Sequence, residues 1–259
     1  MKNTKFYLQA AMLLLPAFLS AQNVIPEPTQ YRPAKGQFVL TAAETKAFEA
    51  QDVLPGRVVQ CVISGSTPMD ADEAYHLKIT PDSVFIQSAT ATGAFRGKET
   101  LKQLLRSGKG TAKACVINDA PRYAWRGFML DESRHFFGKK KVKQLLDIMA
   151  SLRLNVFHWH LTDEPGWRIE IKKYPLLTQI GAKGNWHDPD APATFYTQDD
   201  IKEIVAYAAA RHIMVVPEFD MPGHATAACR AYPELSGGGE GRWKDFTFHP
   251  CKEETFRFI

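Results

Sequence analysis

The chain has 259 residues, of which 45% are hydrophobic and 23% are charged, so it can bury one large core or two modest ones. Its 32 Lys and Arg residues exceed its 28 Asp and Glu residues by only four, and this balance gives no support to nucleic-acid binding. Its four cysteines, at positions 61, 115, 229 and 251, lie too far apart for a zinc ribbon or a redox pair.

The first residues have the pattern of a signal peptide. Lys2 and Lys5 precede an apolar run over residues 6–19, and the small residue Ala21 follows it. We expect cleavage after Ala21, so that residues 1–21 are removed and the protein is secreted or periplasmic. No cysteine directly follows the run to accept a lipid, and no later stretch reaches the roughly 20 apolar residues of a membrane-spanning helix.

Residues 22–120 alternate short strand-like runs with turns, and we expect a small N-terminal α+β domain here. Residues 75–79 and 83–87 flank Thr80-Pro-Asp82 and predict a β-hairpin. Residues 92–106 place apolar side chains on one helical face, and Gly108 and Gly110 follow to end the helix.

From Pro121 onward the sequence repeats an apolar strand that ends in an acid, followed by a helix. The predicted strands span residues 127–131, 155–163 and 213–220, and the predicted helices span residues 140–152 and 199–211. Strands that alternate with helices at this spacing are typical of a parallel sheet with crossover helices.

The second of these strands favours a barrel over a doubly wound sheet. His158, His160 and Thr162 lie on one face, and the apolar residues Phe157, Trp159 and Leu161 lie on the other. An apolar face packs under helices, a polar face suits a barrel interior near its functional rim, and no Gly-rich phosphate loop follows any strand. We therefore expect residues 121–259 to form the first three βα units of an incomplete (β/α)8 TIM barrel.

Polar side chains gather where each predicted strand ends. These residues are Asp131 and Arg134 after the first strand, His160 and Asp163 on the second, and Glu218 and His224 near the third. A single Arg or His at a strand end is most often a structural salt-bridge partner. Three strand ends that converge predict a functional site, because barrel enzymes build their sites at this rim.

Two kinds of ligand suit such a rim. An arginine and carboxylates hydrogen-bond sugar hydroxyls, and Trp159, Trp167 or Trp186 offers a ring on which a pyranose can stack. His158 and His160 point the same way on a strand and offer the alternative of a zinc site, and hence a metal-dependent barrel hydrolase. A lone pair of this kind is a weak signal, so no metal is expected.

Three motifs resemble those of family 20 glycoside hydrolases, the β-N-acetylhexosaminidases. They are PRYAWRGFMLDESRHF at residues 121–136, HWHLTDEPGWR at 158–168 and VPEFDMPGH at 216–224. The motifs occur in the family's order behind a small α+β domain, so the resemblance covers nearly the whole chain after the leader.

The resemblance implies that Arg134 binds hydroxyls of the terminal sugar. It also implies that Asp163 and His224 form a network that sets the charge of the general acid, supported by His160 and Glu218. The implied reaction is exo-acting and retaining hydrolysis of terminal β-linked N-acetylhexosamine. It uses the substrate's own acetamido oxygen as nucleophile and needs no cofactor. The implied partners are N-acetylhexosamine-terminated glycans or chitooligosaccharides.

The sequence departs from the family at the catalytic pair. The family's adjacent Asp and Glu follow the fourth barrel strand in a Gly-Gly-Asp-Glu type motif that these 259 residues lack. Asp163-Glu164 follows the second strand and does not match that pair. We therefore expect a fragment that is inactive alone, with a non-catalytic sugar-binding remnant as the alternative. Cys251 resembles one half of a family disulfide, and its mate, Cys229 or none, stays open.

Overall fold

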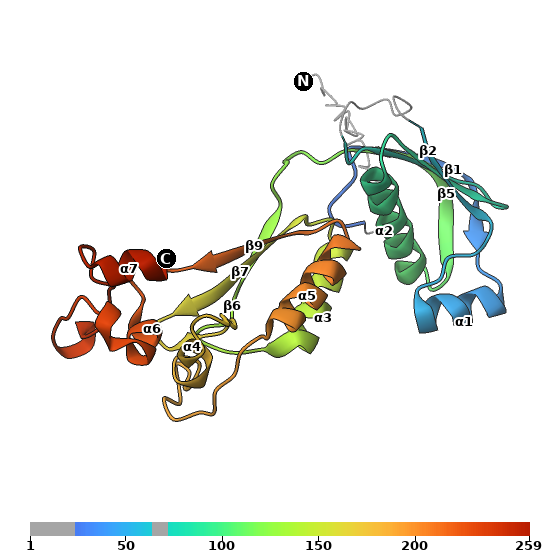
Figure 1. Ribbon diagram of the computed structural model, residues 1–259. Helices are drawn as coiled ribbons and strands as arrows, with labels where there is room; N and C mark the ends of the chain where they lie inside the picture. Colours follow the sequence, from blue (N-terminus) through green and yellow to red (C-terminus); the bar gives the residue numbers. More distant parts are fainter. Residues whose placement is uncertain (1–23, 64–71) are drawn as a thin grey trace, which may run out of the picture.

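The computed structural model describes residues 24–63 and 72–259, so the predicted signal peptide lies outside the described residues. The fold is mixed α/β and contains two sheets, which lie beside each other in the molecule (Figure 1). Helix α2 (Ala91–Ser107) lies on the face of the first sheet that is turned toward the second.

The first sheet has five strands in the order β1-β5-β3-β4-β2. These strands are β1 (Gln30–Val39), β2 (Val58–Val62), β3 (Tyr75–Ile79), β4 (Val84–Ser88) and β5 (Thr111–Asp119), and helix α1 (Ala42–Gln51) follows β1. The predicted hairpin is confirmed, because β3 and β4 pair antiparallel with Leu77 opposite Ile86. The predicted helix over residues 92–106 is confirmed as α2.

The strand alternation of this sheet explains its core. Leu77 and Ile79 on β3 are buried, and they share a core cluster with Leu101, Leu104 and Leu105 of α2. Each of these side chains contributes about 1.5–3 kcal/mol by leaving water, so the two-residue period of the strand fixes which face α2 covers.

The second sheet has β7 (Val156–Asp163) at its centre. The strands β6 (Gly127–Asp131) and β9 (Met214–Phe219) pair with it in parallel on either side, as predicted, and the two-residue strand β8 (Gly166–Trp167) pairs antiparallel with its end. The predicted crossover helices are confirmed as α3 (Gly138–Ser151) and α5 (Gln198–Ala209). The remaining short segments are α4 (Leu176–Gln179), α6 (Thr226–Ala231), η1 (Pro233–Leu235), η2 (Gly241–Trp243) and α7 (Glu253–Phe258).

The predicted division of β7 into two faces is confirmed. Phe157, Trp159 and Leu161 are buried in one cluster with apolar residues of α3 and α5. His158, His160 and Thr162 alternate with them and therefore lie on the opposite face of the strand. The helices thus hold β7 in place through its apolar face and leave the polar face for a site.

Buried arginines join the two sheets. Arg153, which follows α3, donates to Tyr75 Oη at 3.0 Å and to Thr100 Oγ1 at 2.6 Å. Arg96 on α2 donates to the carbonyl of His212 at 2.9 Å. Hydrogen bonds to charged groups contribute about 1.5–3 kcal/mol each, so these contacts fix the second sheet relative to the first.

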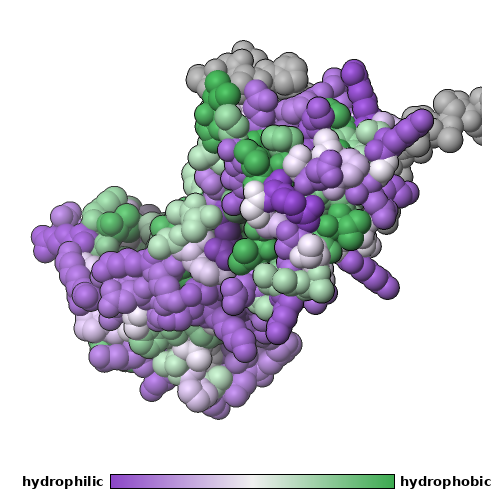
Figure 2. All heavy atoms as spheres, turned by 90° about the vertical axis from the view of Figure 1, so that its right-hand side faces the viewer, coloured by the Kyte–Doolittle hydropathy of each residue, from purple (hydrophilic) through white to green (hydrophobic). Residues whose placement is uncertain are grey.

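The surface on the side of the first sheet is mostly hydrophilic, with separate hydrophobic patches (Figure 2).

All four cysteines are unpaired. Cys115 and Cys229 are buried, and Cys61 and Cys251 are exposed. Over residues 24–63 and 72–259, no helix is both long enough and apolar enough to cross a membrane.

The start of α5 offers a test of local structure. Thr197 Oγ1 accepts from the backbone N–H of Asp200 at 3.1 Å, and the Asp200 side chain accepts from the backbone N–H of Thr197 at 3.1 Å. We expect Thr197→Ala to lower the free energy of unfolding by about 1 kcal/mol, because one helix-end N–H loses its partner. Urea unfolding measures this, with Thr197→Ser as the matched control that keeps the hydroxyl. Equal stability of the two variants would show that the cap contributes nothing.

Candidate active site

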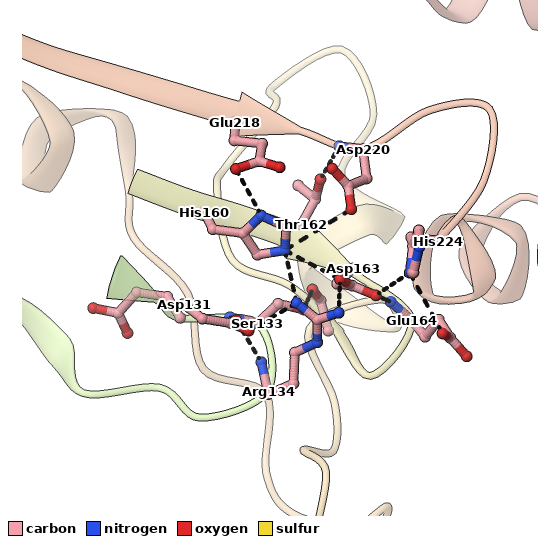
Figure 3. Close-up of polar contacts among 12 residues, drawn as sticks. Asp131, Ser133, Arg134, His160, Thr162, Asp163, Glu164, Glu218, Asp220 and His224 are labelled. Atoms are coloured by element: carbon pink, nitrogen blue, oxygen red, sulfur yellow. Dashed lines mark hydrogen bonds and ion pairs between the residues drawn. The ribbon is translucent and has the colours of Figure 1, made fainter. Parts of the chain in front are cut away.

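The carboxyl ends of three parallel strands bring the predicted residues together (Figure 3). In the sheet register Asp131 of β6 lies opposite His160 of β7, and His160 lies opposite Glu218 of β9. Parallel neighbours in register place their side chains on the same face. One row across the sheet therefore supplies the centre of the candidate site.

Arg134 is held in place by the turn that follows β6. Asp131 Oδ1 accepts from the backbone N–H groups of Ser133 at 2.9 Å and Arg134 at 3.0 Å, which closes the turn. The Arg134 Nη1 atom donates to Asp131 Oδ2 at 2.7 Å, and Nη2 forms an ion pair with Asp163 Oδ2. The guanidinium is thus oriented by two carboxylates while its side chain stays 34% exposed, which leaves donors for a ligand.

His160 lies between two carboxylates. Its Nδ1 atom is 3.1 Å from Glu218 Oε2, and its Nε2 atom is 3.1 Å from Asp163 Oδ2. Burial alone would lower the pKa of His160, but the hydrogen bonds to Asp163 and Glu218 outweigh burial and raise the pKa to about 9. The imidazole is therefore cationic at neutral pH and donates through both nitrogens.

A cationic His160 lies close to a second cation, since Arg134 Nη1 is 3.1 Å from His160 Nε2. The carboxylates of Asp131 and Asp163 lie against these two groups and compensate the repulsion. The charges of this centre thus depend on each other, and loss of one changes the protonation of the rest.

Asp163 connects His160 to the rim. Its side chain is only 1% exposed, and its Oδ1 atom accepts from the backbone N–H of Glu164 at 2.6 Å and lies 3.0 Å from His224 Nδ1. Burial raises the pKa of Asp163, but the bonds from His160 and Glu164 and the charges of Arg134 and His224 outweigh it, so the pKa lies below its usual value. Asp163 is therefore an anion that joins Arg134, His160 and His224.

His224 is the exposed end of the network. It has a positive φ of 53° directly after Pro222-Gly223, and its ring packs edge-on against Phe246 at 4.9 Å between centroids. Its side chain is 44% exposed, whereas the Asp163 that it contacts is buried. A strained backbone that presents a titratable side chain is a common feature of functional sites.

The predicted site residues form one connected set in the structure. They are Arg134, His160, Asp163, Glu218 and His224.

The alternative of a zinc site held by His158 and His160 can be compared with the positions of these side chains. Among the described residues, the groups with the spacing of metal ligands are His160 with Asp163 and Asp220, and Asp163 with Glu164 and His224. His158 belongs to neither group and instead contacts Glu218, so a His158–His160 ligand pair gains no support.

Two contributors were not assigned a role from the sequence. Asp220 lies one residue past β9, where burial and the nearby charges of Asp163 and Glu218 raise its pKa. Arg168 is fully buried and donates to the carbonyl of Ser133 at 2.8 Å, beside Arg134. The position of Arg168 directly after Gly166 and Trp167 in the second motif could have drawn attention to it. Its acceptors are backbone carbonyls, however, and no sequence pattern identifies them.

Models of known families match most of the chain. The catalytic-domain model of glycosyl hydrolase family 20 matches residues 123–259, and the model of that family's domain 2 matches residues 45–120. The chain belongs to glycosyl hydrolase family 20. Every residue of the connected set lies within the catalytic-domain match, so the site described above is part of that family's catalytic domain.

Individual relatives agree. A β-hexosaminidase of Porphyromonas gingivalis is 34% identical over 88% of this chain and 34% of its own length, and one of Vibrio furnissii is 37% identical over 92% of this chain and 45% of its own length. The chain therefore spans less than half the length of these curated relatives.

Solved structures of the family are also similar. A β-N-acetylhexosaminidase from Bacteroides fragilis has a TM-score of 0.76 and 32% identity, with 91% of this chain and 52% of that chain covered. The N-acetyl-β-hexosaminidase of Streptomyces plicatus in complex with Thio-NAglucal has a TM-score of 0.79 and 32% identity, with 92% of this chain and 55% of that chain covered.

The raised pKa of His160 predicts a pH dependence of the family 20 site. The pKa of His160 is about 6.5 in the unfolded chain and about 9 in the folded one. Its contribution to the free energy of unfolding is therefore fully present below pH 6.5 and is lost as the pH rises to about 9. We expect Asp163→Asn to bring the pKa of His160 back toward 6.5, because a carboxylate that holds its proton is removed.

Histidine NMR titration of the chain and of Asp163→Asn measures these values. Asn has nearly the same size and shape as Asp, so the substitution removes the charge with little change in packing. A His160 pKa at or below 6.5 in the unaltered chain would contradict the charge assignment.

Proposed function

We propose that this chain carries the part of a β-N-acetylhexosaminidase site that binds the terminal sugar and sets the charge around the reaction. One observation carries the proposal: Arg134 is joined to His224 through Asp163 at the carboxyl ends of β6 and β7, beside His160. A cation, an anion and an exposed histidine in one network suit the binding of a polyhydroxylated ligand beside a proton-transfer step.

Arg134 is the proposed sugar-binding residue. Its planar guanidinium presents several donors in a fixed geometry, and two of its contacts are already made to Asp131 and Asp163. The remaining donors match neighbouring hydroxyls on a pyranose. Since the carboxylates hold the group in place before the ligand arrives, little conformational entropy is lost on binding.

Asp163 and His224 are the proposed charge-setting residues, with His160 and Glu218 in support. In the proposed reaction the 2-acetamido oxygen of the substrate attacks the anomeric carbon as the leaving oxygen is protonated. Water then opens the oxazolinium ion with retention. An acid that first donates and then accepts a proton needs a pKa near the working pH, and fixed neighbouring charges supply that tuning.

The adjacent Asp and Glu of this mechanism are the part that we place outside the 259 residues, since no Gly-Gly-Asp-Glu type motif occurs in the sequence. We propose accordingly that the chain alone binds sugar without hydrolysing it. We further propose a signal peptide at 1–21 with secretion or export to the periplasm, a small domain at 22–120, and the first three βα units of a barrel at 121–259.

Calorimetry and an aryl N-acetylglucosaminide assay on the same preparation test the proposal. We expect measurable binding of N-acetylglucosamine and no turnover by the chain. Absence of binding would overturn the sugar-binding role. Turnover that persists after contaminating enzyme is excluded would overturn the placing of the catalytic pair outside the chain.

The proposed reaction has a stereochemical consequence for the complete hydrolase. Proton NMR of its first product is expected to show the β-anomer, because two displacements at the anomeric carbon restore the configuration. An initial α-anomer would contradict retention. The alternative of a non-catalytic sugar-binding remnant requires that the whole gene product also fail to hydrolyse the substrate.

A further inference from the structure

A buried carboxyl group lies at the base of the turn that carries Arg134. Glu132 directly follows the last residue of β6, and its side chain is fully buried. Its backbone N–H donates to the carbonyl of His160 at 3.0 Å, which continues the pairing of β6 with β7. Because side chains alternate along a strand, Glu132 points away from the face on which Asp131 and His160 form the candidate site. A ligand on that face therefore does not reach its carboxyl group.

The Glu132 carboxylate joins the two ends of this turn. Its Oε2 atom accepts from the backbone N–H of Phe137 at 2.7 Å. The carboxylate also accepts from the backbone N–H of Gly138, the first residue of α3, where the helix dipole favours an anion. Residues 133–136, which include Arg134, therefore form a loop that this one side chain closes.

Tyr196 holds the same carboxylate from the segment that precedes α5. It is buried, and its hydroxyl donates to Glu132 Oε1 at 2.6 Å. Its ring also packs against that of Phe136 at 4.7 Å between centroids, so it contacts the loop twice. Burial raises the pKa of Glu132, and the hydrogen bonds from Tyr196 and from the backbone oppose this rise. A buried carboxylate with hydrogen bonds to both oxygens is rigid, and it makes the loop rigid with it.

We propose that Glu132 is a positioning residue of the sugar site: it holds the loop so that the Arg134 guanidinium meets the sugar hydroxyls, and it does not contact the sugar. The inference rests on the proposed function, since it assumes that Arg134 binds sugar. Asp131 orients Arg134 on the face of the site, whereas Glu132 and Tyr196 fix the loop from the opposite face. Hydrogen bonds weaken steeply as their geometry departs from the optimum, so a loosened loop is expected to weaken binding.

Calorimetry with N-acetylglucosamine on three variants tests this role. We expect Glu132→Ala to weaken binding about threefold to tenfold, the range that one buried hydrogen bond provides. Glu132→Gln is expected to restore most of the affinity, since its amide oxygen accepts from Phe137 and its amide nitrogen donates to the Tyr196 hydroxyl. Tyr196→Phe keeps the ring and removes only the hydroxyl, so it tests the same contact even where the alanine variant does not fold. It is expected to weaken binding about twofold to threefold.

Glu170 supplies the matched control. Its carboxylate accepts from the backbone N–H of Gln198, the first residue of α5, at 3.0 Å. It thus holds the start of a crossover helix, as Glu132 does, but its hydrogen bond is to α5 and not to the Arg134 loop. Glu170→Ala should lower the free energy of unfolding and leave the Kd for N-acetylglucosamine unchanged.

Nitrogen-15 NMR of the Arg134 Nε–Hε group gives a second measurement, without ligand. Its signal is expected to move in Glu132→Ala and not in Glu170→Ala, because a loss of stability alone does not change the surroundings of Arg134. Unchanged Kd values in Glu132→Ala and Tyr196→Phe, or an equal weakening by Glu170→Ala, would overturn the positioning role while the proposed function stands. Failure of the unaltered chain to bind N-acetylglucosamine would overturn both.

Discussion

Arg168→Ala is expected to lower the free energy of unfolding by about 3–5 kcal/mol, because the substitution removes a buried cation and leaves its acceptors unpaired. Arg168 is fully buried, and its guanidinium donates to backbone carbonyls of two segments, the turn after β6 and residues 182–194. These acceptors belong to Glu132, Ser133, Ala182, Gly184 and Thr194. A buried acceptor that loses its donor costs about 1–3 kcal/mol, and several lose it together.

The charge of Arg168 persists under ordinary conditions. Burial lowers its pKa to about 10, which still leaves the group protonated at neutral pH. Arg168→Lys is expected to recover only part of the stability, because a single ammonium group cannot donate to all the carbonyls that the planar guanidinium reaches. Urea unfolding measures both variants, with Arg32→Ala on the exposed face of β1 as the control, where a change within about 0.5 kcal/mol is expected. A loss at Arg168 no larger than at Arg32 would contradict its structural role.

Arg134→Ala is expected to weaken binding of N-acetylglucosamine by about 30-fold to 1,000-fold, or about 2–4 kcal/mol. The substitution removes the donors to the sugar hydroxyls and leaves buried Asp163 without one of its cations. Arg134→Lys keeps the charge and loses the planar fork, so an intermediate affinity is expected.

Calorimetry on folded preparations, with folding checked by circular dichroism, measures these affinities. Arg32→Ala is again the matched control, since it removes an exposed arginine on the first sheet and should leave binding unchanged. Equal affinities of the Arg134→Ala variant and the unaltered chain would remove Arg134 from the sugar site.

Much of the site followed from the period of one strand. The alternation along β7 separated His160 and Thr162 from Trp159 and Leu161, and the parallel register then placed Asp131 and Glu218 beside His160. The first step needs only the alternation that every strand shares, so the sequence predicted it, whereas the register came from the structure.

Other parts of the site depend on the course of irregular segments and on side-chain packing, which the hydrophobic periodicity of the sequence does not predict. The acceptors of Arg168 are carbonyls in an irregular segment whose route is set by Gly184 and Asn185. The sequence offered Trp159, Trp167 and Trp186 equally as stacking rings, and burial by α3, α5 and α6 decided between them. The contact of His158 with Glu218, in place of a metal pair with His160, likewise depends on the rotamers of both side chains.

A crystal structure of the chain with N-acetylglucosamine tests the central claim most directly. The account predicts a sugar over the carboxyl ends of β6 and β7, with two hydroxyl oxygens within hydrogen-bond distance of the Arg134 guanidinium and Asp163 still joined to His160 and His224. A sugar bound elsewhere on the molecule, or none at a saturating concentration, would contradict it.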